Sequence, residues 1–151
     1  MHIIKSVFLA TTLLAFVCSA QTGQAPAPAP KPANPAFHAL VNEAGAHVRH
    51  IDTKELGRMI SEHGDFVLID VRETEEWQTG HAAGAVHISR GILEPRIEGV
   101  AADKNKRIVL YCSAGMRSAL AAESLQRMGY TNVWSLDGGF TAYKAAGLPI
   151  Q

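Results

Sequence analysis

Apolar and polar residues follow one another along the chain in short blocks, and these blocks predict strands separated by helices. A continuous apolar run at 66–69 and a second strand-like run at 107–111 are typical of strands that are covered on both faces. Shorter runs predict further strands at 48–51, 85–88 and 133–136. Five short extended segments are therefore expected between residues 48 and 136.

The segments between these strands carry the spacing and the end signals of helices. We expect helices at 52–63, 118–128 and 140–146, because apolar residues recur there at three- and four-residue intervals and a glycine follows each segment. Asp52 is a suitable N-cap residue for the first of them. Residues 36–47 contain Ala, His, Glu and Gly and predict at most a short amphipathic turn.

Short strands that alternate with helices predict an α/β domain with a central parallel sheet and helices on both faces. Ligands of such sheets bind beyond the carboxyl ends of the strands. Asp70 and Cys112 both stand at the ends of predicted strands. A functional site is therefore expected at that edge of the sheet.

The N-terminus has the features of a secretory signal peptide. Lys5 precedes an apolar run at 7–17, and three small residues end the segment at Ala20, after which we expect cleavage. The run is shorter than the roughly 20 apolar residues of a spanning helix. A retained membrane anchor and a lipoprotein acylated on Cys18 are the alternatives. Cleavage predicts a periplasmic or secreted protein with no stable membrane insertion.

The predicted organisation has three parts. A signal peptide covers 1–20, an Ala/Pro-rich linker with an N-terminal extension covers 21–47, and the folded domain covers 48–151. The prolines of the linker fix φ and remove backbone donors, which gives a semi-extended, solvated spacer.

Composition excludes several classes of function. With 14 basic and 14 acidic side chains, the chain has no excess positive charge for nucleic acid. The seven histidines lack the spacing of metal ligands, so neither a metal nor a cofactor is expected. Loss of Cys18 with the signal peptide leaves Cys112 as the one thiol, which cannot form an internal disulfide. An exported protein with one cysteine points to a reactive thiol, an intermolecular link or a buried, inert thiol.

Cys112 lies between a predicted strand and a predicted helix, where backbone N–H groups converge and stabilise anions. A free cysteine has a pKa of roughly 8.5, so a nucleophilic thiolate needs such stabilisation. The helix dipole and the Arg117 guanidinium would add to it, Gly115 would permit the turn, and Ser118 would cap the helix. Separately, these residues also suit an ordinary turn glycine, a surface cation and a simple cap. Next to one cysteine, they predict an active site.

The residues of this loop resemble the active-site loop of the rhodanese (sulfurtransferase) family. The resemblance rests on the stretch Cys112, Ser113, Ala114, Gly115, Met116, Arg117 and Ser118. Two further stretches agree with it, one at 70–85, which begins Asp-Val-Arg-Glu, and one at 137–149, which begins Asp-Gly-Gly-Phe. The resemblance implies a three-layer rhodanese-like domain with a parallel sheet of about five strands.

The resemblance also implies a reaction and roles for the residues. Cys112 would take a sulfane sulfur from thiosulfate or a similar anionic donor, become a persulfide, and pass the sulfur to cyanide or a thiol, including a thiol of a partner protein. The loop N–H groups of residues 113–118 would hold the persulfide. Arg117 would attract the donor; Arg72 would either do the same or form a structural ion pair, while Asp70 and Glu76 would orient the loop and the arginines.

Three other functions would use some of the same residues. Dual-specificity phosphatases share the fold but have five residues between Cys and Arg, whereas four separate Cys112 from Arg117, which suits sulfur better than phosphate. A carrier of sulfur or a soft metal ion would use the same cysteine with little turnover. A redox role is disfavoured because the mature chain, without Cys18, has no second cysteine to resolve a disulfide.

Overall fold

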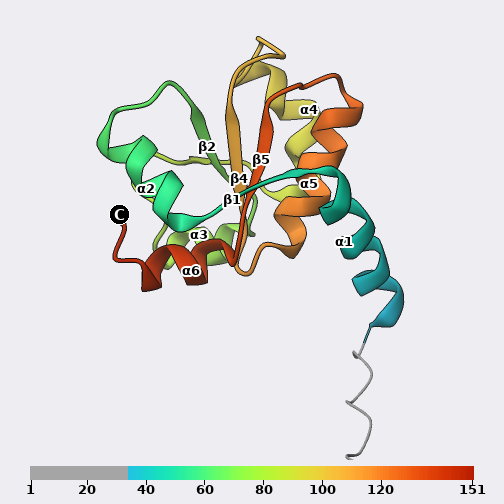
Figure 1. The fold of residues 1–151 in the computed structure, drawn as a ribbon, viewed down its shortest axis with the longest axis horizontal. Helices are drawn as coiled ribbons and strands as arrows, with labels where there is room; N and C mark the ends of the chain where they lie inside the picture. Colours follow the sequence, from blue (N-terminus) through green and yellow to red (C-terminus); the bar gives the residue numbers. More distant parts are fainter. Residues whose placement is uncertain (1–33) are drawn as a thin grey trace, which may run out of the picture. The chain divides into compact units, whose positions relative to one another are not determined.

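The computed structural model describes residues 34–151; the predicted signal peptide and most of the Ala/Pro-rich linker lie outside the described residues. A five-stranded sheet forms the centre of this part of the chain, with the order β1-β5-β4-β2-β3 and every neighbouring pair parallel (Figure 1). The strands are β1 Arg49–Ile51, β2 Val67–Asp70, β3 Val86–His87, β4 Ile108–Tyr111 and β5 Val133–Leu136. The predicted α/β class and the predicted parallel sheet are confirmed.

Helices connect the strands and cover the sheet. They are α1 Pro35–His47, α2 Thr53–Ser61, α3 Thr74–Gln78, α4 Leu93–Arg96, α5 Met116–Arg127 and α6 Gly139–Ala145, with 3₁₀ turns at Arg90–Ile92 and Ile97–Gly99. In the described part of the chain no helix is long and apolar enough to cross a bilayer.

Both faces of the sheet are buried, because alternate residues of each central strand point to opposite sides. Ile69 and Leu110 belong to the core on the side of α4 and α5. Leu68 and Val109 belong to the core on the other side, with residues of α2 and α6. This burial explains why the two central strands have continuous apolar sequences. It also fixes the carboxyl ends of β2 and β4 side by side, with Asp70 opposite Tyr111.

Helix α2 begins as the sequence predicts. The Asp52 side chain accepts a hydrogen bond of 2.8 Å from the backbone N–H of Glu55, which satisfies one of the free donors of the first helical turn. The predicted helix end at residue 63 is two residues too late, since α2 ends at Ser61.

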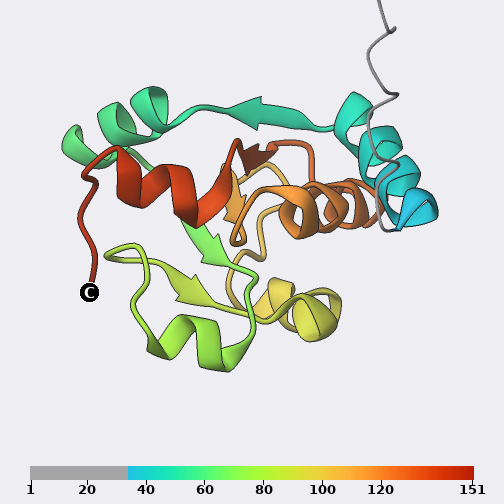
Figure 2. The same cartoon turned by 90° about the horizontal axis from the view of Figure 1, so that it is seen from below.

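The prediction of at most a short turn at 36–47 is wrong, since these residues lie in the 13-residue helix α1. Pro35 stands at the start of the helix, where its fixed φ and missing N–H are compatible with helical structure. Ala44 is fully buried, and α1 packs beside α5, as Figures 1 and 2 both show. The stability of α1 therefore comes from packing on α5, which its weakly patterned sequence does not reveal.

Candidate active site

Cys112 lies directly after β4, at the carboxyl end of the central strand of the sheet. Its side chain is buried, and it is the free cysteine of the described residues. The chain then turns through a short loop into α5, which begins at Met116, two residues before the predicted start. Gly115 is the N-cap residue with φ of 97°, a conformation that side chains disfavour. The catalytic loop, defined here as 112–118, is therefore a tight strand-to-helix turn.

The sulfur atom of Cys112 faces hydrogen-bond donors of this loop. The backbone N–H of Gly115 points at Sγ with a nitrogen–sulfur distance of 3.2 Å, and the Ser118 hydroxyl lies 3.8 Å from the same atom. The N–H groups of the first turn of α5 have no acceptor within the helix and carry its positive dipole end. The sulfur atom therefore lies among hydrogen-bond donors at the start of α5.

Ser118 does not cap α5 as the sequence predicted; it lies inside the helix and is fully buried. Its hydroxyl is 2.9 Å from the carbonyl oxygen of Gly115 and 2.9 Å from the hydroxyl of Ser135 on β5. A hydroxyl has a single proton to donate. When Ser135 donates to Ser118, the Ser118 proton is shared between the Gly115 carbonyl and the sulfur of Cys112. Ser135 was not singled out by the sequence.

The first turn of α6 is hydrogen-bonded to the catalytic loop. The N–H of Phe140 donates to the carbonyl of Cys112 at 2.7 Å, and the N–H of Thr141 donates to the carbonyl of Ser113 at 3.1 Å. In a trans peptide the C=O and N–H groups point in opposite directions. The N–H groups of Ser113 and Ala114 are therefore turned away from α6.

This close approach depends on Gly139, the residue at which α6 begins. A Cβ atom at Gly139 would lie 2.8 Å from the backbone nitrogen of Ala114 and closer still to the carbonyl oxygen of Cys112. The φ of Gly139 is 55°, in the left-handed region. Only glycine satisfies both requirements, which explains why a glycine stands at position 139. The explanation requires the structure, because it depends on the contact between the start of α6 and the loop after β4.

Arg117 forms an ion pair with Glu76 of α3 across the loop. Its two terminal nitrogens lie 2.7 and 2.8 Å from the two carboxylate oxygens, a bidentate arrangement. Ser113 joins this cluster, because its hydroxyl accepts from Arg117 at 2.9 Å and donates to Glu76. The resemblance implied that Arg117 attracts an anionic donor; in the structure a carboxylate neutralises the charge of Arg117.

The same cluster shifts the pKa values of its members. Hydrogen bonds from Arg117, supported by the Ser113 hydroxyl, outweigh burial and lower the pKa of Glu76 to about 2. The pKa of Arg117 is raised, chiefly by its hydrogen bonds to Glu76, and the nearby sulfur of Cys112 acts in the same direction. Glu76 therefore stays ionised at any physiological pH and fixes the orientation of the guanidinium.

Arg72 lies in a different environment from the loop arginine. Its guanidinium, only 4% exposed, binds both carboxylate oxygens of the fully buried Asp70, with distances of 2.6 to 3.0 Å. It also donates to the carbonyl of Gly80 at 2.8 Å and lies 4.1 Å from the centre of the Phe140 ring. The structure thus places Arg72 and Asp70 in a buried ion pair that supports the start of α6.

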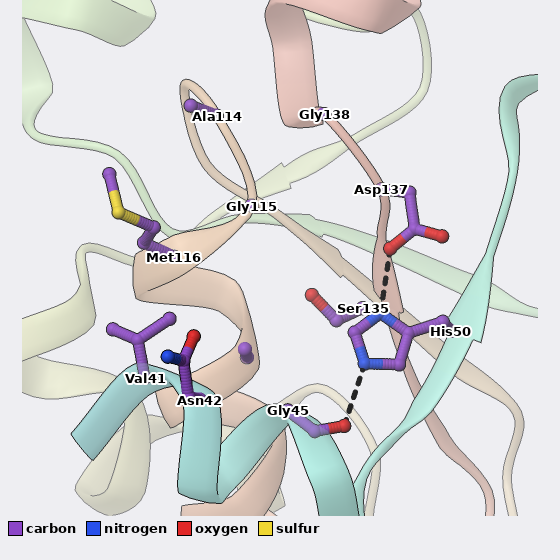
Figure 3. Close-up of a pocket in the computed structure, with 11 residues that line it drawn as sticks. Val41, Asn42, Gly45, His50, Ala114, Gly115, Met116, Ser135, Asp137 and Gly138 are labelled. Atoms are coloured by element: carbon purple, nitrogen blue, oxygen red, sulfur yellow. Dashed lines mark hydrogen bonds and ion pairs between the residues drawn. The ribbon is translucent and has the colours of Figure 1, made fainter. Parts of the chain in front are cut away.

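Of the remaining loop residues, Ala114 is exposed at the tip and Met116 is exposed at the start of α5 (Figure 3). Neither carries a charge, so the charged side chain of the loop is that of Arg117, which is paired with Glu76. Of the predicted loop residues, the structure brings Gly115 and Ser118 to the sulfur of Cys112 and directs Ser113 and Arg117 to Glu76, while Asp70 and Arg72 form a separate buried pair. Ser135, Gly139 and Glu76 complete the arrangement.

Comparison with known proteins gives consistent matches. The family model of the rhodanese-like domain matches residues 52–146. Thiosulfate sulfurtransferase GlpE of Coxiella burnetii is 35% identical over 98 residues, which cover 65% of this chain and 86% of the relative. A Rhodopseudomonas palustris protein of unknown function, described as a possible tyrosine phosphatase, has a TM-score of 0.72 and 31% identity, covering 81% of this chain and 98% of its own. The polysulfide-sulfur transferase homodimer of Wolinella succinogenes has a TM-score of 0.67 and 31% identity, covering 77% and 87%.

Proposed function

The chain belongs to the rhodanese family, and from that premise we propose that it moves a sulfane sulfur from thiosulfate or a similar donor to a thiol or cyanide through a persulfide on Cys112. The observation that carries this proposal is the position of the Cys112 sulfur, 3.2 Å from the Gly115 nitrogen at the start of α5. An anion on that sulfur, or on a second sulfur bound to it, meets backbone N–H groups that are already oriented.

The reaction has two half-reactions. In the first, the Cys112 thiolate attacks the outer sulfur of thiosulfate, a new S–S bond forms, and the old S–S bond breaks as sulfite leaves with the electron pair. In the second, a thiolate or cyanide attacks the outer sulfur of the persulfide, and the electron pair of the broken S–S bond returns to Cys112. Such covalent catalysis gives ping-pong kinetics.

The size of the loop supports sulfur rather than phosphate as the group transferred. Four residues separate Cys112 from Arg117, and the Arg117 side chain is bound by Glu76 rather than left for the equatorial oxygens of a phosphate. The description of the Rhodopseudomonas relative as a possible phosphatase makes a phosphatase assay with p-nitrophenyl phosphate a necessary comparison.

The neutralised Arg117 also bears on the choice of donor. A loop without a free cation binds anionic donors through backbone N–H groups alone, which discriminate weakly among thiosulfate, polysulfide and other persulfides. We therefore expect broad donor use rather than a strong preference for thiosulfate. A panel of donors at equal concentration, scored by persulfide formation on Cys112, measures this breadth.

Intact-protein mass spectrometry after incubation with thiosulfate tests the mechanism. Wild type should gain the mass of one sulfur atom, and cyanide should remove it again with release of thiocyanate. The Cys112→Ser variant should gain nothing. Equal masses for the two proteins after treatment would contradict the persulfide mechanism.

A carrier would load sulfur but would not turn over without a partner protein. Steady-state production of thiocyanate from thiosulfate and cyanide separates the two functions. Continuous turnover by the purified protein supports the enzyme, and release of about one equivalent followed by a stop supports the carrier.

We further propose that the protein is exported, on the strength of Lys5, the apolar run at 7–17 and the small residues before Gln21. Expression of the full chain in a bacterium followed by periplasmic extraction tests the proposal. The extracted protein should begin at Gln21. An uncleaved N-terminus in the cytoplasmic fraction would overturn export.

A further inference from the structure

Two buried serines lie beside the sulfur of Cys112. Ser118, in the first turn of α5, is fully buried, and its hydroxyl oxygen is 3.8 Å from Cys112 Sγ. Ser135, on β5, is also buried, and its side chain points toward the start of α5 (Figure 3). The two hydroxyl oxygens are 2.9 Å apart. A buried polar pair therefore lies against the atom that the proposed reaction uses as its nucleophile.

The number of protons and acceptors fixes the direction of the hydrogen bond between these serines. Each hydroxyl has one proton to donate. In the described part of the chain, Ser118 is the one hydrogen-bond partner of the Ser135 hydroxyl. If Ser118 donated to Ser135, the Ser135 proton would be buried without an acceptor, which is unfavourable. Ser135 therefore donates, and Ser118 keeps its own proton for another acceptor.

The Ser118 proton has two acceptors within reach. One is the carbonyl oxygen of Gly115 at 2.9 Å, and the other is the sulfur of Cys112 at 3.8 Å. A neutral sulfur is a weak acceptor, whereas hydrogen bonds to an ionised acceptor are strong. Rotation of the hydroxyl moves its proton from one acceptor to the other without displacing a heavy atom. The charge on the sulfur therefore decides which acceptor the proton takes.

This charge differs between the two forms of the cysteine in the proposed reaction. In the unloaded thiolate, the negative charge is on Cys112 Sγ. In the persulfide, the charge is on the outer sulfur, and Sγ is a neutral atom bonded to carbon and sulfur. The N–H of Gly115, 3.2 Å from Sγ, is fixed by the backbone and cannot turn. The Ser118 hydroxyl can turn, so it can respond to the loss of charge on Sγ.

We propose that Ser118 is a switchable donor that stabilises the unloaded thiolate of Cys112, and that Ser135 is the residue that positions it. The inference rests on the proposed function and concerns its second half-reaction. When a thiolate, cyanide or sulfite attacks the outer sulfur, the S–S bond breaks and its electron pair returns to Cys112. The Ser118 proton then turns from the Gly115 carbonyl to Sγ.

Ser135 acts through Ser118 and does not touch the sulfur. Its hydrogen bond holds the Ser118 oxygen in place, and it also makes the Ser118 hydroxyl a better donor, because hydrogen bonds in a chain polarise one another. The serine pair therefore shifts the balance between the two forms of Cys112 toward release of the sulfur.

The equilibrium between thiosulfate and sulfite tests this switch. Thiosulfate loads Cys112 with release of sulfite, and sulfite removes the sulfur again. The ratio of the two anions at which half of Cys112 is persulfide therefore measures the relative stability of the two forms. Intact-protein mass spectrometry gives the loaded fraction at about pH 9.5, where ordinary thiols are ionised. Ser118→Ala should shift this equilibrium about tenfold toward the persulfide, because the thiolate loses a donor.

Variants of Ser135 test the positioning role. Ser135→Ala should shift the equilibrium about threefold in the same direction, because Ser118 keeps its proton but loses the hydrogen bond that holds it. Ser135→Thr is the matched control, since it keeps the hydroxyl and its added methyl group has room in a cavity of about 380 Å³ that Ser135 lines. It should give the wild-type equilibrium. The double variant Ser118→Ala/Ser135→Ala should match Ser118→Ala, since Ser135 acts only through Ser118.

Each outcome decides one part of the proposal. A wild-type equilibrium in Ser118→Ala overturns the switch, and a double variant that shows the product of the two single shifts overturns the positioning role of Ser135. A merely structural role of the serines would lower the free energy of unfolding in urea without moving the equilibrium. Should Ser135→Ala not fold, a shifted equilibrium in Ser118→Ala with an unshifted one in Ser135→Thr still supports the switch.

The same measurement separates this inference from the proposed function. Failure of the wild-type protein to form a persulfide at any ratio of thiosulfate to sulfite refutes the proposed function. Normal loading of the wild type, with an unchanged equilibrium in Ser118→Ala, refutes the switch alone.

Discussion

Replacing Gly139 with alanine should damage both stability and catalysis, because this residue lets α6 approach the catalytic loop. Two separate costs apply. A non-glycine residue at φ of 55° costs roughly 1–2 kcal/mol. The added Cβ would lie 2.8 Å from the Ala114 nitrogen, so α6 or the loop must move. The movement adds about 1–3 kcal/mol of overpacking strain and endangers the Phe140–Cys112 hydrogen bond, which contributes about 1 kcal/mol.

The matched control is Gly147→Ala, just beyond the end of the same helix. Gly147 has φ of 68°, and a Cβ there meets nothing within 4 Å. The control therefore carries the backbone cost of roughly 1–2 kcal/mol without the collision. Gly139→Ala should cost roughly 3–6 kcal/mol in total, which is at least about 2 kcal/mol more than the control.

Urea unfolding followed by circular dichroism gives both free energies of unfolding, and mass spectrometry gives the rate of persulfide formation from thiosulfate. Gly139→Ala should slow the formation of the persulfide, because displaced carbonyls turn the loop N–H groups out of place, whereas Gly147→Ala should form it at the wild-type rate. Equal free energies of unfolding for the two variants, with equal persulfide rates, would refute the account of α6 as the support of the loop.

Three other substitutions probe the site. Glu76→Gln should lower the free energy of unfolding above about pH 4.5, and the difference from wild type should shrink as pH falls toward about 2. The reason is that the pKa of Glu76 is lowered in the folded protein, so its contribution to stability is lost when the carboxylate becomes protonated. Urea titrations across this pH range measure the difference in the free energy of unfolding. Asp70→Asn should cost about 3–5 kcal/mol of unfolding free energy, since Arg72 is left buried without its charged partner. Ser135→Ala should slow alkylation of Cys112 by iodoacetamide at neutral pH about threefold, because the buried hydroxyl pair beside the sulfur is broken.

Each of these has an outcome that contradicts it. A pH-independent effect of Glu76→Gln would mean that the ion pair adds nothing to stability. Wild-type stability of Asp70→Asn would show that the buried arginine does not need its partner. An unchanged alkylation rate in Ser135→Ala, with stability also unchanged, would remove Ser135 from the support of the thiolate.

The sequence predicts the sheet well because the two central strands are buried on both faces and therefore have continuous apolar sequences. It predicts the position of Cys112 for the same reason, since this cysteine directly follows one of these two strands. Helix α1 was missed because its stability comes from packing on α5 rather than from an apolar stripe of its own. The resemblance, rather than the local pattern, implied that Glu76 orients the arginines. Partners such as Ser135 with Ser118, or Gly139 with the cysteine loop, depend on how separate segments meet, which local patterns do not encode.

The ion pair between Arg117 and Glu76 has a consequence for how the protein responds to salt. The Glu76 carboxylate lies 2.7 Å from the Arg117 guanidinium and cancels its positive charge. The electric field that reaches solvent is therefore that of the backbone dipoles, which falls off within a few ångströms. Dissolved ions screen charges over a Debye length of about 10 Å at 0.1 M. The long-range attraction between the loop and an anionic donor is small, so added salt has little effect on it. Donor capture should proceed at nearly the same rate in dilute and in concentrated salt.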